Sequence, residues 1–490
     1  MWTKRTLQQT LKDRLSDVLF LVVSNREPYV HRIEGEELIC ERPASGLTIA
    51  LDPVMRACGG LWVAHGSGNG DRQVVDANGH ITVPTDNPAY TLRRVWLTKE
   101  EEDGYYYGFS NRALWPLCHI AYTRPSFDAR EWAAYRTVNE KFARVVLEEV
   151  GERNAFVFIQ DYHFALLPRL LRRPNIRVAQ FWHIPWPNPE AFRICPWGAE
   201  ILDGLLGNDL LGFHITFHCQ NFLAAVERVV EAKVDYEHAT VTRGGLNTKI
   251  RAFPISVDFE AIANLAKSPE VSAEMERLTR LHRLRGKLLV VGVDRIDYTK
   301  GILERFQAIA RLLEGHPELQ ERVVFVEVGV PSRTRIAEYQ RLNEEIDELV
   351  ESINWKFQTD AWKPILYLRR NTSPITLQAW YGLATVGVVT SLHDGMNLVA
   401  KEFVASRIKE DGVLVLSQFT GAARQLTDAE LVNPFAIDEL AATLHRAMTM
   451  PLEEQQRRMR RLRAQVQERN IYRWAGEVLS ELFQFEFQEA

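Results

Sequence analysis

Short runs of β-branched and other apolar residues alternate with helical patterns along the chain, and this alternation constrains the fold more than any other feature. The runs expected to form strands in the first half are 18–25, 92–97, 155–161, 176–183 and 209–214. Those in the second half are 287–294, 322–329, 364–368, 386–391 and 412–417. Such alternation is typical of parallel sheets covered by helices. The sequence therefore predicts an α/β protein.

A helix is expected between the first two strands of the second half, over residues 302–315. Its apolar residues recur at helical spacing, and Gly315 is well placed to end it. The residues expected on its apolar face are Ile302, Phe306, Ile309, Ala310 and Leu313.

The length of 490 residues is too great for one compact core, so we expect two domains. The strand–helix pattern begins again after "KIRAFPISVD", which places one domain at 1–254 and the next at 255–465. The aromatic-rich segment 466–490 is expected to form a helix that packs back on the N-terminal domain. Two Rossmann-like doubly wound domains facing a central cleft would bind ligands there, at the carboxyl ends of their strands.

Composition excludes several classes of protein. The net charge is −5, and lysine and arginine are scattered, which argues against a nucleic-acid partner. Five widely spaced cysteines without a C-x-x-C pair favour neither a disulfide framework nor a zinc site, and they suit a reducing cytoplasm. The N-terminus has no cleavable apolar region, and the early run "VLFLVV" is too short to cross a membrane. We expect a cytoplasmic protein that does not bind membranes.

Asp161 and His183 each follow a predicted strand of the first domain. If these strands are neighbours, both side chains lie at the same edge of the sheet and can contact the hydroxyl groups of a sugar. For either residue alone, a local helix cap or backbone contact explains it as well. Paired metal ligation is a third alternative, but no further carboxylate or histidine stands at suitable spacing.

Arg295 and Lys300 follow a predicted strand of the second domain and precede a helix. Two cations beside a helix N-terminus can neutralise a diphosphate without a metal. The sequence contains no D-x-D triplet, and we expect no metal and no cofactor. A surface salt bridge among Asp294, Arg295 and Asp297 explains the spacing equally well.

The stretch "TSLHDGMNLVAKEF" places polar residues where a strand should give way to a helix. Gly395 permits a tight turn, and the helix is expected to start near Asn397. Asp394 can accept hydrogen bonds from sugar hydroxyls, and Glu402 can meet a ribose diol. The helix start favours a bound diphosphate through the backbone amides of Met396, Asn397 and Leu398. An ordinary capped helix with a solvated Glu402 is the alternative.

The glycine-rich segments give weaker signals. "GGLWVAHGSGNGD" lacks the G-x-G-x-x-G fingerprint between a strand and a helix, so it does not predict a nicotinamide site, and surface turns are expected. In "PASGLTIAL", Gly46 begins a helical pattern, and its amide can approach a phosphate.

Many strings in this chain resemble one family over nearly its whole length. The strings include "VVSNR", "FSNRALWPLCH", "QDYHFALLP", "HIPWPNPE", "DRIDYTKG", "PSR" and "DGMNLVAKEF". They resemble the trehalose-6-phosphate synthases, retaining glucosyltransferases of the GT-B fold. The resemblance implies transfer of glucose from a nucleotide sugar, usually UDP-glucose, to glucose 6-phosphate.

The resemblance also implies roles for individual residues. The expected catalytic residues are Asp161, His183, Arg295, Lys300 and Asp394. The expected donor-binding residues are Gly46, Arg295, Lys300, Asp394, Met396, Asn397, Leu398 and Glu402. The expected acceptor pocket consists of Arg26, Tyr106, Trp115, Asp161 and Arg333, with Arg26 and Arg333 facing the 6-phosphate. It further places the acceptor in the N-terminal domain and the nucleotide sugar in the C-terminal domain.

Some residues depart from the family pattern. Ser45 stands where a glycine is usual, Ser391 replaces a common proline, and His393 replaces an arginine before Asp394. The segment between Arg26 and Gly46 is longer than usual and is expected to form a hairpin.

Alternatives to this function stay open. The "REPY" string resembles a sister group, the glucosylglycerol-phosphate synthases, which use glycerol 3-phosphate, whereas Arg333 argues against that group. A sugar-nucleotide epimerase and a non-catalytic sugar-phosphate sensor are further alternatives. The sequence contains no D-x-D-G-T motif, so a separate phosphatase is expected, and a homo-oligomer stays open.

Overall fold

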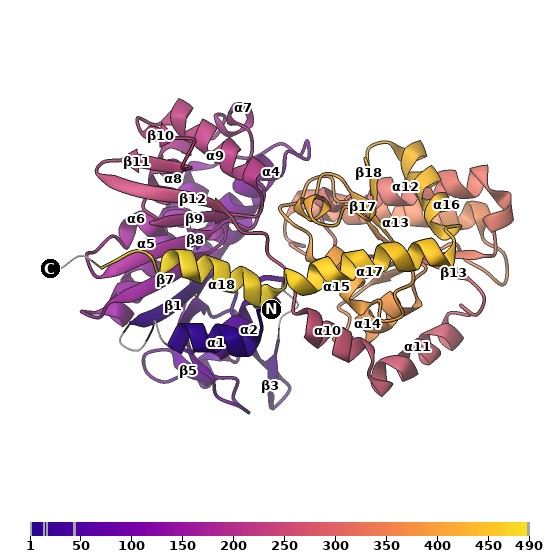
Figure 1. Cartoon of the computed structure of the whole chain (residues 1–490), viewed down its shortest axis with the longest axis horizontal. Helices are drawn as coiled ribbons and strands as arrows, with labels where there is room; N and C mark the ends of the chain where they lie inside the picture. Colours follow the sequence, from indigo (N-terminus) through magenta and orange to yellow (C-terminus); the bar gives the residue numbers. More distant parts are fainter. Residues whose placement is uncertain (1, 13–14, 16–17, 43–45, 488–490) are drawn as a thin grey trace. The chain divides into compact units, whose positions relative to one another are not determined.

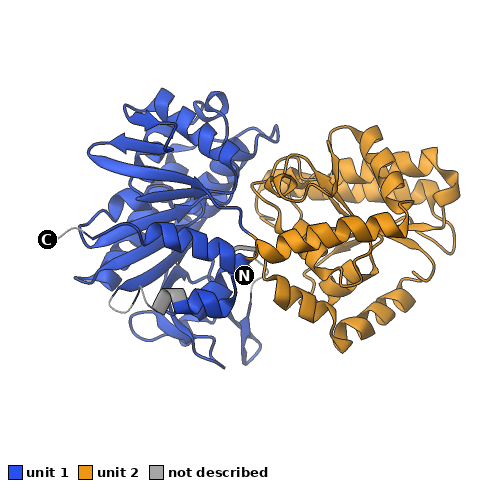
Figure 2. Cartoon of the chain, viewed as in Figure 1, with its two compact units in different colours: residues 1–255, 471–490 blue, residues 256–470 orange. Residues whose placement is uncertain are grey.

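The structure is a computed structural model that describes residues 2–12, 15, 18–42 and 46–487. It divides into two compact units (Figure 2). Unit 1 comprises Met1–Ile255 and Ile471–Ala490, and unit 2 comprises Ser256–Asn470. The chain therefore leaves unit 1 once and returns to it for its last residues.

Unit 1 contains a ten-stranded sheet with the order β10-β11-β12-β9-β8-β7-β1-β4-β6-β5. The seven strands from β12 to β6 are parallel, and the edge strands β5, β10 and β11 pair antiparallel. The strands are β1 Leu19–Ser24, β4 Leu61–His65, β5 His80–Val83, β6 Tyr90–Val95, β7 Ala155–Gln160, β8 Ile176–Phe181, β9 Leu210–Phe213, β10 Lys233–Asp235, β11 Thr240–Arg243 and β12 Leu246–Ala252. The order runs outward from β1 in both directions, as in doubly wound sheets.

Helices accompany the sheet of unit 1 (Figure 1). They are α1 Lys4–Lys12, α2 Gly46–Cys58, α3 Lys99–Glu102, α4 Trp115–His119, α5 Ala129–Val150, α6 Leu167–Leu170, α7 Pro189–Phe192, α8 Gly198–Leu205, α9 Thr216–Val229 and α18 Ile471–Leu482, with the π-helical segment η2 Asp103–Leu114 between α3 and α4. The last helix, α18, contacts α1, α2, β8 and β9. Its Trp474 ring lies 5.2 Å from the ring of Phe181 on β8, so an aromatic contact fastens α18 to the sheet.

Unit 2 contains a six-stranded parallel sheet with the order β15-β14-β13-β16-β17-β18. This is the 3-2-1-4-5-6 order of a doubly wound fold. The strands are β13 Leu288–Arg295, β14 Val323–Val330, β15 Ile365–Arg369, β16 Val386–Val389, β17 Val413–Ser417 and β18 Glu430–Val432. The helices are α10 Phe259–Ala266, α11 Pro269–Leu281, α12 Ile302–Gly315, α13 Ala337–Phe357, α14 Pro374–Leu383, α15 Leu398–Ser406, α16 Ile437–Met448 and α17 Leu452–Glu468.

The α/β prediction with two doubly wound sheets is confirmed. The helix expected over 302–315 is α12, and Ile302, Phe306, Ile309 and Leu313 are buried, whereas Ala310 is only partly buried. The segment expected to fold as a hairpin forms β2 Val30–Glu34 and β3 Glu37–Glu41, which pair antiparallel. The segment 466–490 begins inside α17, and α18 starts at Ile471.

Several strands were not predicted from the sequence: β4, β5, β10, β11, β12 and β18. The glycine-rich segment expected as surface turns contains β4, whose five residues are all buried beside β1. Gly60 has φ +97, and an added Cβ would lie 2.4 Å from the carbonyl oxygen of Phe20, so this glycine allows the close approach of β4 to β1. None of the described helices is both long and apolar enough to cross a membrane.

Candidate functional site

The carboxyl ends of β13 and β16 mark the point in unit 2 where the strand order reverses. The two strands pair in parallel, with Val290 opposite Val386. The connections leave the two strands in opposite directions, and doubly wound sheets generally bind their ligands at such a point. The loop after β13 carries Lys300, and the loop after β16 carries Asp394. The strand order thus brings together two candidates that stand far apart in the sequence.

Lys300 and Asp394 form an ion pair at this edge. The Lys300 ammonium donates to Asp394 Oδ2 at 2.5 Å, and Lys300 is buried. The same oxygen accepts from Ser391 Oγ and from Asn397 Nδ2, each at 3.2 Å. Ser391, a departure from the family pattern, therefore supplies a hydrogen-bond donor that a proline would lack. The carboxylate holds the ammonium in place, and an ammonium has further N–H groups for a ligand.

Helix α15 begins at Leu398, and Asn397 caps it, which confirms the predicted helix start. Asn397 Oδ1 accepts from the amide of Ala400 at 2.9 Å. Asn397 has φ +97, an uncommon conformation for a residue with a side chain, and Met396 before it is buried. The first turn of a helix leaves N–H groups without intrahelical partners and carries partial positive charge. This turn can therefore receive an anion.

Glu402 lies in the middle of α15. Burial raises its pKa to about 7, and the hydroxyl of Tyr381 donates to Oε2 at 3.3 Å. Glu402 is partly buried, whereas the alternative interpretation expects it to be fully solvated. A partly buried carboxylate that titrates near neutrality is typical of functional sites.

Arg305 on α12 organises the loop between β13 and α12, and the sequence analysis did not identify it. This fully buried guanidinium donates to Asp294 at 2.6 Å and to Glu327 at 2.7 Å. It also donates to Thr390 Oγ1 at 2.9 Å, and that hydroxyl lies within 3.2 Å of the carbonyl oxygen of Lys300. Burial raises the pKa of Glu327 to about 7. The network fixes the strand end that carries Arg295 and Lys300.

Asp294 and Asp297 are both buried, so the salt bridge considered for Asp294, Arg295 and Asp297 does not lie at the surface. Asp297 accepts from Arg333 at 3.0 Å and from the hydroxyl of Tyr339 at 2.8 Å. Burial works to raise the pKa of Asp297, but Arg333 and Arg295 together hold it below its usual value. Arg333 has φ +50 and is buried, so this contact fixes the arginine expected to bind phosphate.

Asp161 and His183 lie together in unit 1. They follow β7 and β8, which are parallel neighbours with Gln160 opposite Phe181. Asp161 Oδ1 accepts from the amide of Tyr162 at 2.9 Å and from the amide of His183 at 3.2 Å. Asp161 has φ +73, a conformation that residues with side chains adopt mainly at special sites. Asp161 makes the local contact that the alternative interpretation expects, with Tyr162, and it also contacts the backbone of the neighbouring strand end at His183.

The imidazole of His183 is held in its neutral form. Burial lowers its pKa to about 3. Its Nε2 lies 2.9 Å from the side-chain amide of Gln160. His183 is therefore an uncharged group beside an oriented carboxylate at pH 7.

Arg26, Tyr106 and Trp115 also belong to unit 1. Arg26 follows β1, and its guanidinium donates to the hydroxyl of Tyr106 at 3.1 Å. The Tyr106 ring stacks on His163, with centroids 5.7 Å apart. Trp115 is buried, and its ring packs 4.0 Å from that of His119. The structure thus places Arg26 beside Tyr106, at the same edge of the sheet as the end of β7.

Gly46 and the phosphate contact of Arg26 and Arg333 complete the set of candidates. Gly46 is the first residue of α2, and Ser45 lies outside the described residues. Arg26 belongs to unit 1 and Arg333 to unit 2, so the phosphate expected to contact both stays a prediction.

One group among the described residues could hold a metal: His316, Glu318 and His445. The two imidazole rings are stacked, with centroids 3.8 Å apart. His316 and Glu318 follow the carboxyl end of α12 and His445 lies in α16, whereas Lys300 precedes the amino end of α12. It therefore adds nothing to the candidate site.

Comparison with known proteins decides the family. The model of glycosyltransferase family 20 matches residues 19–484. The chain belongs to glycosyltransferase family 20. It is 38% identical to the trehalose-6-phosphate synthase of Mycolicibacterium vanbaalenii, over 94% of this chain and 95% of that protein. It is also 38% identical to the bifunctional trehalose-6-phosphate synthase/phosphatase of Thermoproteus tenax, of which it covers 63%.

Solved structures agree with this family 20 assignment. A chain from E. coli bound with UDP-2-fluoro glucose is 31% identical, with a TM-score of 0.85 over 95% of this chain and 99% of that chain. An alpha,alpha-trehalose-phosphate synthase (UDP-forming) from Burkholderia xenovorans, in complex with glucose-6-phosphate, is 32% identical, with a TM-score of 0.84 over 94% and 99%. The predicted resemblance to the trehalose-6-phosphate synthases and the predicted enzyme class, a glycosyltransferase, are confirmed.

Proposed function

We propose that this family 20 enzyme transfers glucose from UDP-glucose to glucose 6-phosphate, with retention at the donor carbon, and forms trehalose 6-phosphate. The observation that carries the proposal is the Lys300–Asp394 ion pair at the point in unit 2 where the strand order reverses. It combines a buried cation for a diphosphate with a fixed carboxylate for a sugar. The relatives with bound UDP-2-fluoro glucose and glucose-6-phosphate support the two substrates.

The donor is bound by unit 2 in this proposal. Arg295 and Lys300 neutralise the diphosphate, and the amides of Met396, Asn397 and Leu398 contact it at the start of α15. Asp394 accepts from glucosyl hydroxyls, and the ionised form of Glu402 accepts from the ribose diol. Gly46, at the start of α2 in unit 1, approaches the donor phosphate.

The acceptor is bound by Arg26, Tyr106, Trp115 and Asp161, together with Arg333. An arginine guanidinium matches the oxygens of a phosphate in pairs, which suits Arg26 and Arg333 to the 6-phosphate. The neutral His183 and the oriented Asp161 contact hydroxyl groups of the reacting sugars.

The chemistry is a substitution through an oxocarbenium-like transition state. The bond from the donor carbon to the diphosphate oxygen breaks, and the acceptor hydroxyl bonds to that carbon on the same face. The leaving phosphate takes the hydroxyl proton. The protein contributes positioning and electrostatic stabilisation, because Arg295 and Lys300 offset the negative charge that develops on the leaving group.

The test is product analysis with purified enzyme. UDP-, ADP- and GDP-glucose are each offered with glucose 6-phosphate and with glycerol 3-phosphate, and products are resolved by mass and by ¹³C NMR. We expect trehalose 6-phosphate from the first acceptor. Glucosylglycerol phosphate as the main product would establish the alternative acceptor, and donor binding without any product would establish a sensor. A separate phosphatase, a homo-oligomer and a cytoplasmic location stay predictions.

A further inference from the structure

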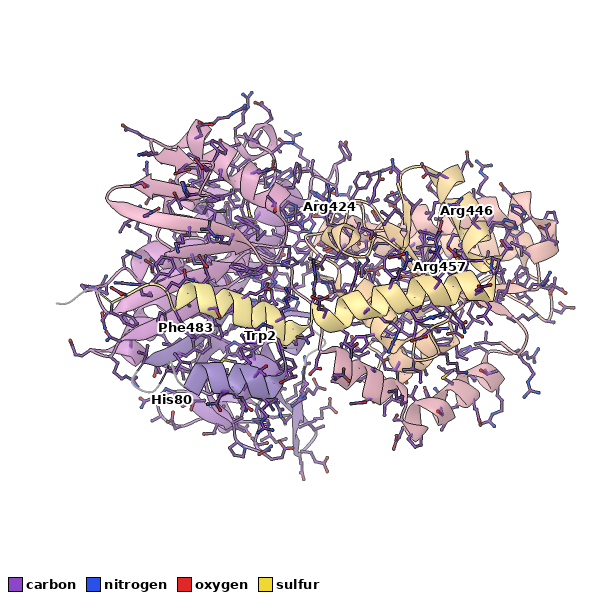
Figure 3. All side chains as sticks on the ribbon, viewed as in Figure 1. Trp2, His80, Arg424, Arg446, Arg457 and Phe483 are labelled. Carbon is purple, nitrogen blue, oxygen red and sulfur yellow. The ribbon has the colours of Figure 1, made fainter. Side chains whose placement is uncertain are left out.

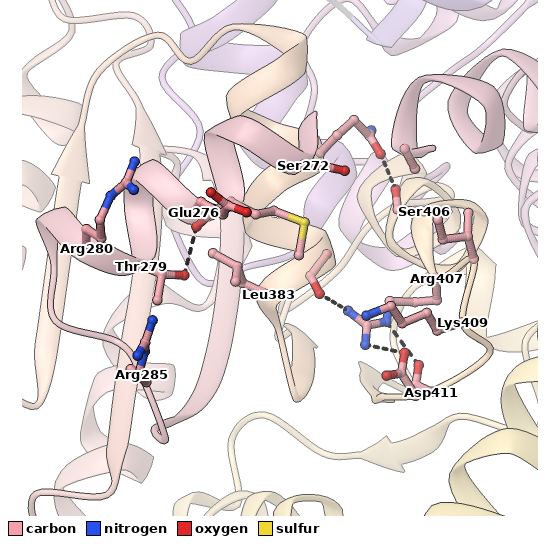
Figure 4. Close-up of a pocket in the computed structure, with 15 residues that line it drawn as sticks. Ser272, Glu276, Thr279, Arg280, Arg285, Leu383, Ser406, Arg407, Lys409 and Asp411 are labelled. Atoms are coloured by element: carbon pink, nitrogen blue, oxygen red, sulfur yellow. Dashed lines mark hydrogen bonds and ion pairs between the residues drawn. The ribbon is translucent and has the colours of Figure 1, made fainter. Parts of the chain in front are cut away.

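A cavity lies within unit 2, away from the candidate site. Its volume is about 540 Å³, and its walls come from α10, α11, α14, the end of α15 and the loop that follows α15 (Figure 4). The lining residues Arg285, Leu383 and Asp411 stand just before β13, β16 and β17 begin. The cavity therefore lies at the amino ends of these strands, whereas Lys300 and Asp394 follow carboxyl ends.

The charge around this cavity is mainly positive. Four cations and two carboxylates line it: Arg280, Arg285, Arg407, Lys409, Glu276 and Asp411. Arg407 is neutralised by Asp411 at 2.5 Å. Among the described residues, Arg280, Arg285 and Lys409 have no ion-pair partner, and they are exposed to solvent. Figure 4 shows Arg280 and Arg285 on one side of the cavity and Lys409 on the other. The cavity therefore presents cations on both of its sides to an anionic ligand.

The floor of the cavity is largely apolar. Met275, Leu383 and Ile408 line it, and Met275 packs so closely on Gly382 that an added Cβ there would lie 2.9 Å from its sulfur. A cavity of a few hundred Å³ with an apolar floor and a few polar groups is typical of small-molecule sites. Apolar surface and unpaired cations together select an organic anion over a bare inorganic one.

Two chains of hydrogen bonds connect this cavity to Glu402. Ser406 lines the cavity, and its hydroxyl lies 2.6 Å from both the Gln378 side chain and the carbonyl oxygen of Glu402. One hydroxyl proton serves only one of these acceptors at a time. Arg407 donates to the carbonyl oxygen of Tyr381 at 2.5 Å, and the Tyr381 hydroxyl donates to the Glu402 carboxylate. A ligand that engages Ser406 or Arg407 therefore acts on the helix that carries Glu402.

We propose that this cavity binds a small organic phosphate, and that its occupation changes the affinity of the enzyme for the nucleotide sugar. Arg280 and Arg285 bind the phosphate, and the organic part packs on the apolar floor next to Ser406 and Arg407, whose hydrogen bonds lead to Glu402. The effect on the donor rests on the proposed function, since that function assigns Glu402 to the ribose. Binding to the cavity itself does not depend on that assignment.

The binding test uses isothermal titration calorimetry on the full chain with adenosine monophosphate and 3-phosphoglycerate as probes. Adenosine monophosphate has one phosphate on a large planar body, whereas 3-phosphoglycerate carries two anionic groups on a small one. We expect at least one probe to bind, and the R280A/R285A double variant to weaken it at least about tenfold. Arg277→Ala, an exposed arginine on the same helix that does not line the cavity, should leave the affinity unchanged. No binding at 10 mM, or equal binding to the double variant, would overturn the proposal.

The coupling test compares UDP titrations with and without the bound probe. We expect the dissociation constant of UDP to change at least about fivefold, and the probe constant to change by the same factor with UDP present. An unchanged UDP constant would overturn the regulatory half. Lys300→Ala separates the two proposals, because it should lose UDP binding and keep probe binding. If UDP binds no form of the enzyme while the probe still binds, the proposed function fails and the cavity site stands.

Discussion

Individual side chains at the donor edge are held by contacts that make their removal informative. Lys300 is the clearest case, because Asp394 fixes its ammonium at 2.5 Å inside a buried setting. Such a preorganised cation stabilises a leaving group without the cost of reorientation during the reaction. We expect the loss of the Lys300 charge to affect catalysis more than folding stability. Asp394 would keep its hydrogen bonds from Ser391 and Asn397.

Lys300→Ala and Arg295→Ala are each expected to lower kcat about 100- to 1000-fold, as the loss of one electrostatic donor does in other enzymes. Steady-state assays of UDP release, with circular dichroism to verify folding, measure the effect. Lys363→Ala, an exposed lysine before β15, is the matched control and should retain full activity. Unchanged turnover in either site variant would refute its role.

Glu402 gives a prediction about pH. Its folded pKa of about 7 lies above the ordinary glutamate value of 4.5, so the native state holds the proton more tightly than the unfolded state does. Its contribution to stability is therefore present below pH 4.5 and is lost as pH rises toward 7. Glu402→Gln should raise the free energy of unfolding at pH 8, by on the order of 1 to 3 kcal/mol, and change it little at pH 4.5. Urea titrations at both pH values measure this.

The neighbouring Lys401 titrates in a different window. Burial lowers its pKa to about 7 from 10.5, so its contribution to stability grows as pH rises from 7 to 10.5. The difference between wild type and Glu402→Gln isolates the carboxyl group, because Lys401 is common to both. A pH-independent difference would show that Glu402 is solvated. UDP affinity of the wild type should rise through pH 7 as Glu402 ionises, and that of the variant should not.

Helix α12 packs on the core of unit 2 partly through a charged residue, Arg305. Arg305 shares a helix face with Ile302 and Phe306, and it is the partner of both Asp294 and Glu327. Arg305→Met is expected to destabilise the protein by about 3 to 5 kcal/mol, because it leaves buried carboxylates without a counter-charge. Arg311→Met, an exposed position on the same helix, should cost no more than about 1 kcal/mol. Chemical denaturation of both variants measures the difference.

A second substitution makes this test specific. Adding Asp294→Asn or Glu327→Gln to Arg305→Met removes one unpaired buried charge and should recover part of the lost stability. If the neutral amides bring no recovery, apolar packing rather than charge explains the loss.

Some strands could be predicted from the sequence and others could not. Central strands such as β7 and β13 were predicted nearly to the residue, because β-branched runs bounded by polar residues specify buried parallel strands. β4 was missed because its two leading glycines resemble a turn, whereas close backbone contact with Phe20 is what requires Gly60. The edge strands β10 and β11 were missed because half-exposed residues lack an apolar run.

The candidate site was predicted unevenly for the same reason. The helix start at Asn397 follows from local sequence alone. The Lys300–Asp394 pair joins residues from two loops, and only the strand order places them together. Arg305 was missed because a charged residue is normally read as exposed, although its spacing from Ile302 and Ile309 put it on the buried face. The helical spacing of Arg305 indicated a buried position, whereas its charge suggested an exposed one.

The last helix of the chain belongs to the unit in which the chain begins. α18 lies in unit 1 and contacts α1, α2, β8 and β9. Its Trp474 is buried, with its ring 5.2 Å from Phe181 and 6.4 Å from His183. The last helix therefore packs beside His183, a candidate catalytic residue that lies almost 300 positions earlier in the sequence.

Trp474→Ala is expected to destabilise unit 1 by about 3 to 5 kcal/mol, as large-to-small substitutions of buried aromatic residues do. The cavity beside Phe181 and His183 should also loosen the imidazole, so kcat should fall while UDP binding, assigned to unit 2, stays unchanged. Calorimetric unfolding and UDP titration measure the two effects. Ser480→Ala, an exposed position on α18, is the control. If UDP binding falls as much as kcat does, donor binding also depends on α18. The proposed assignment of the donor to unit 2 would then be wrong.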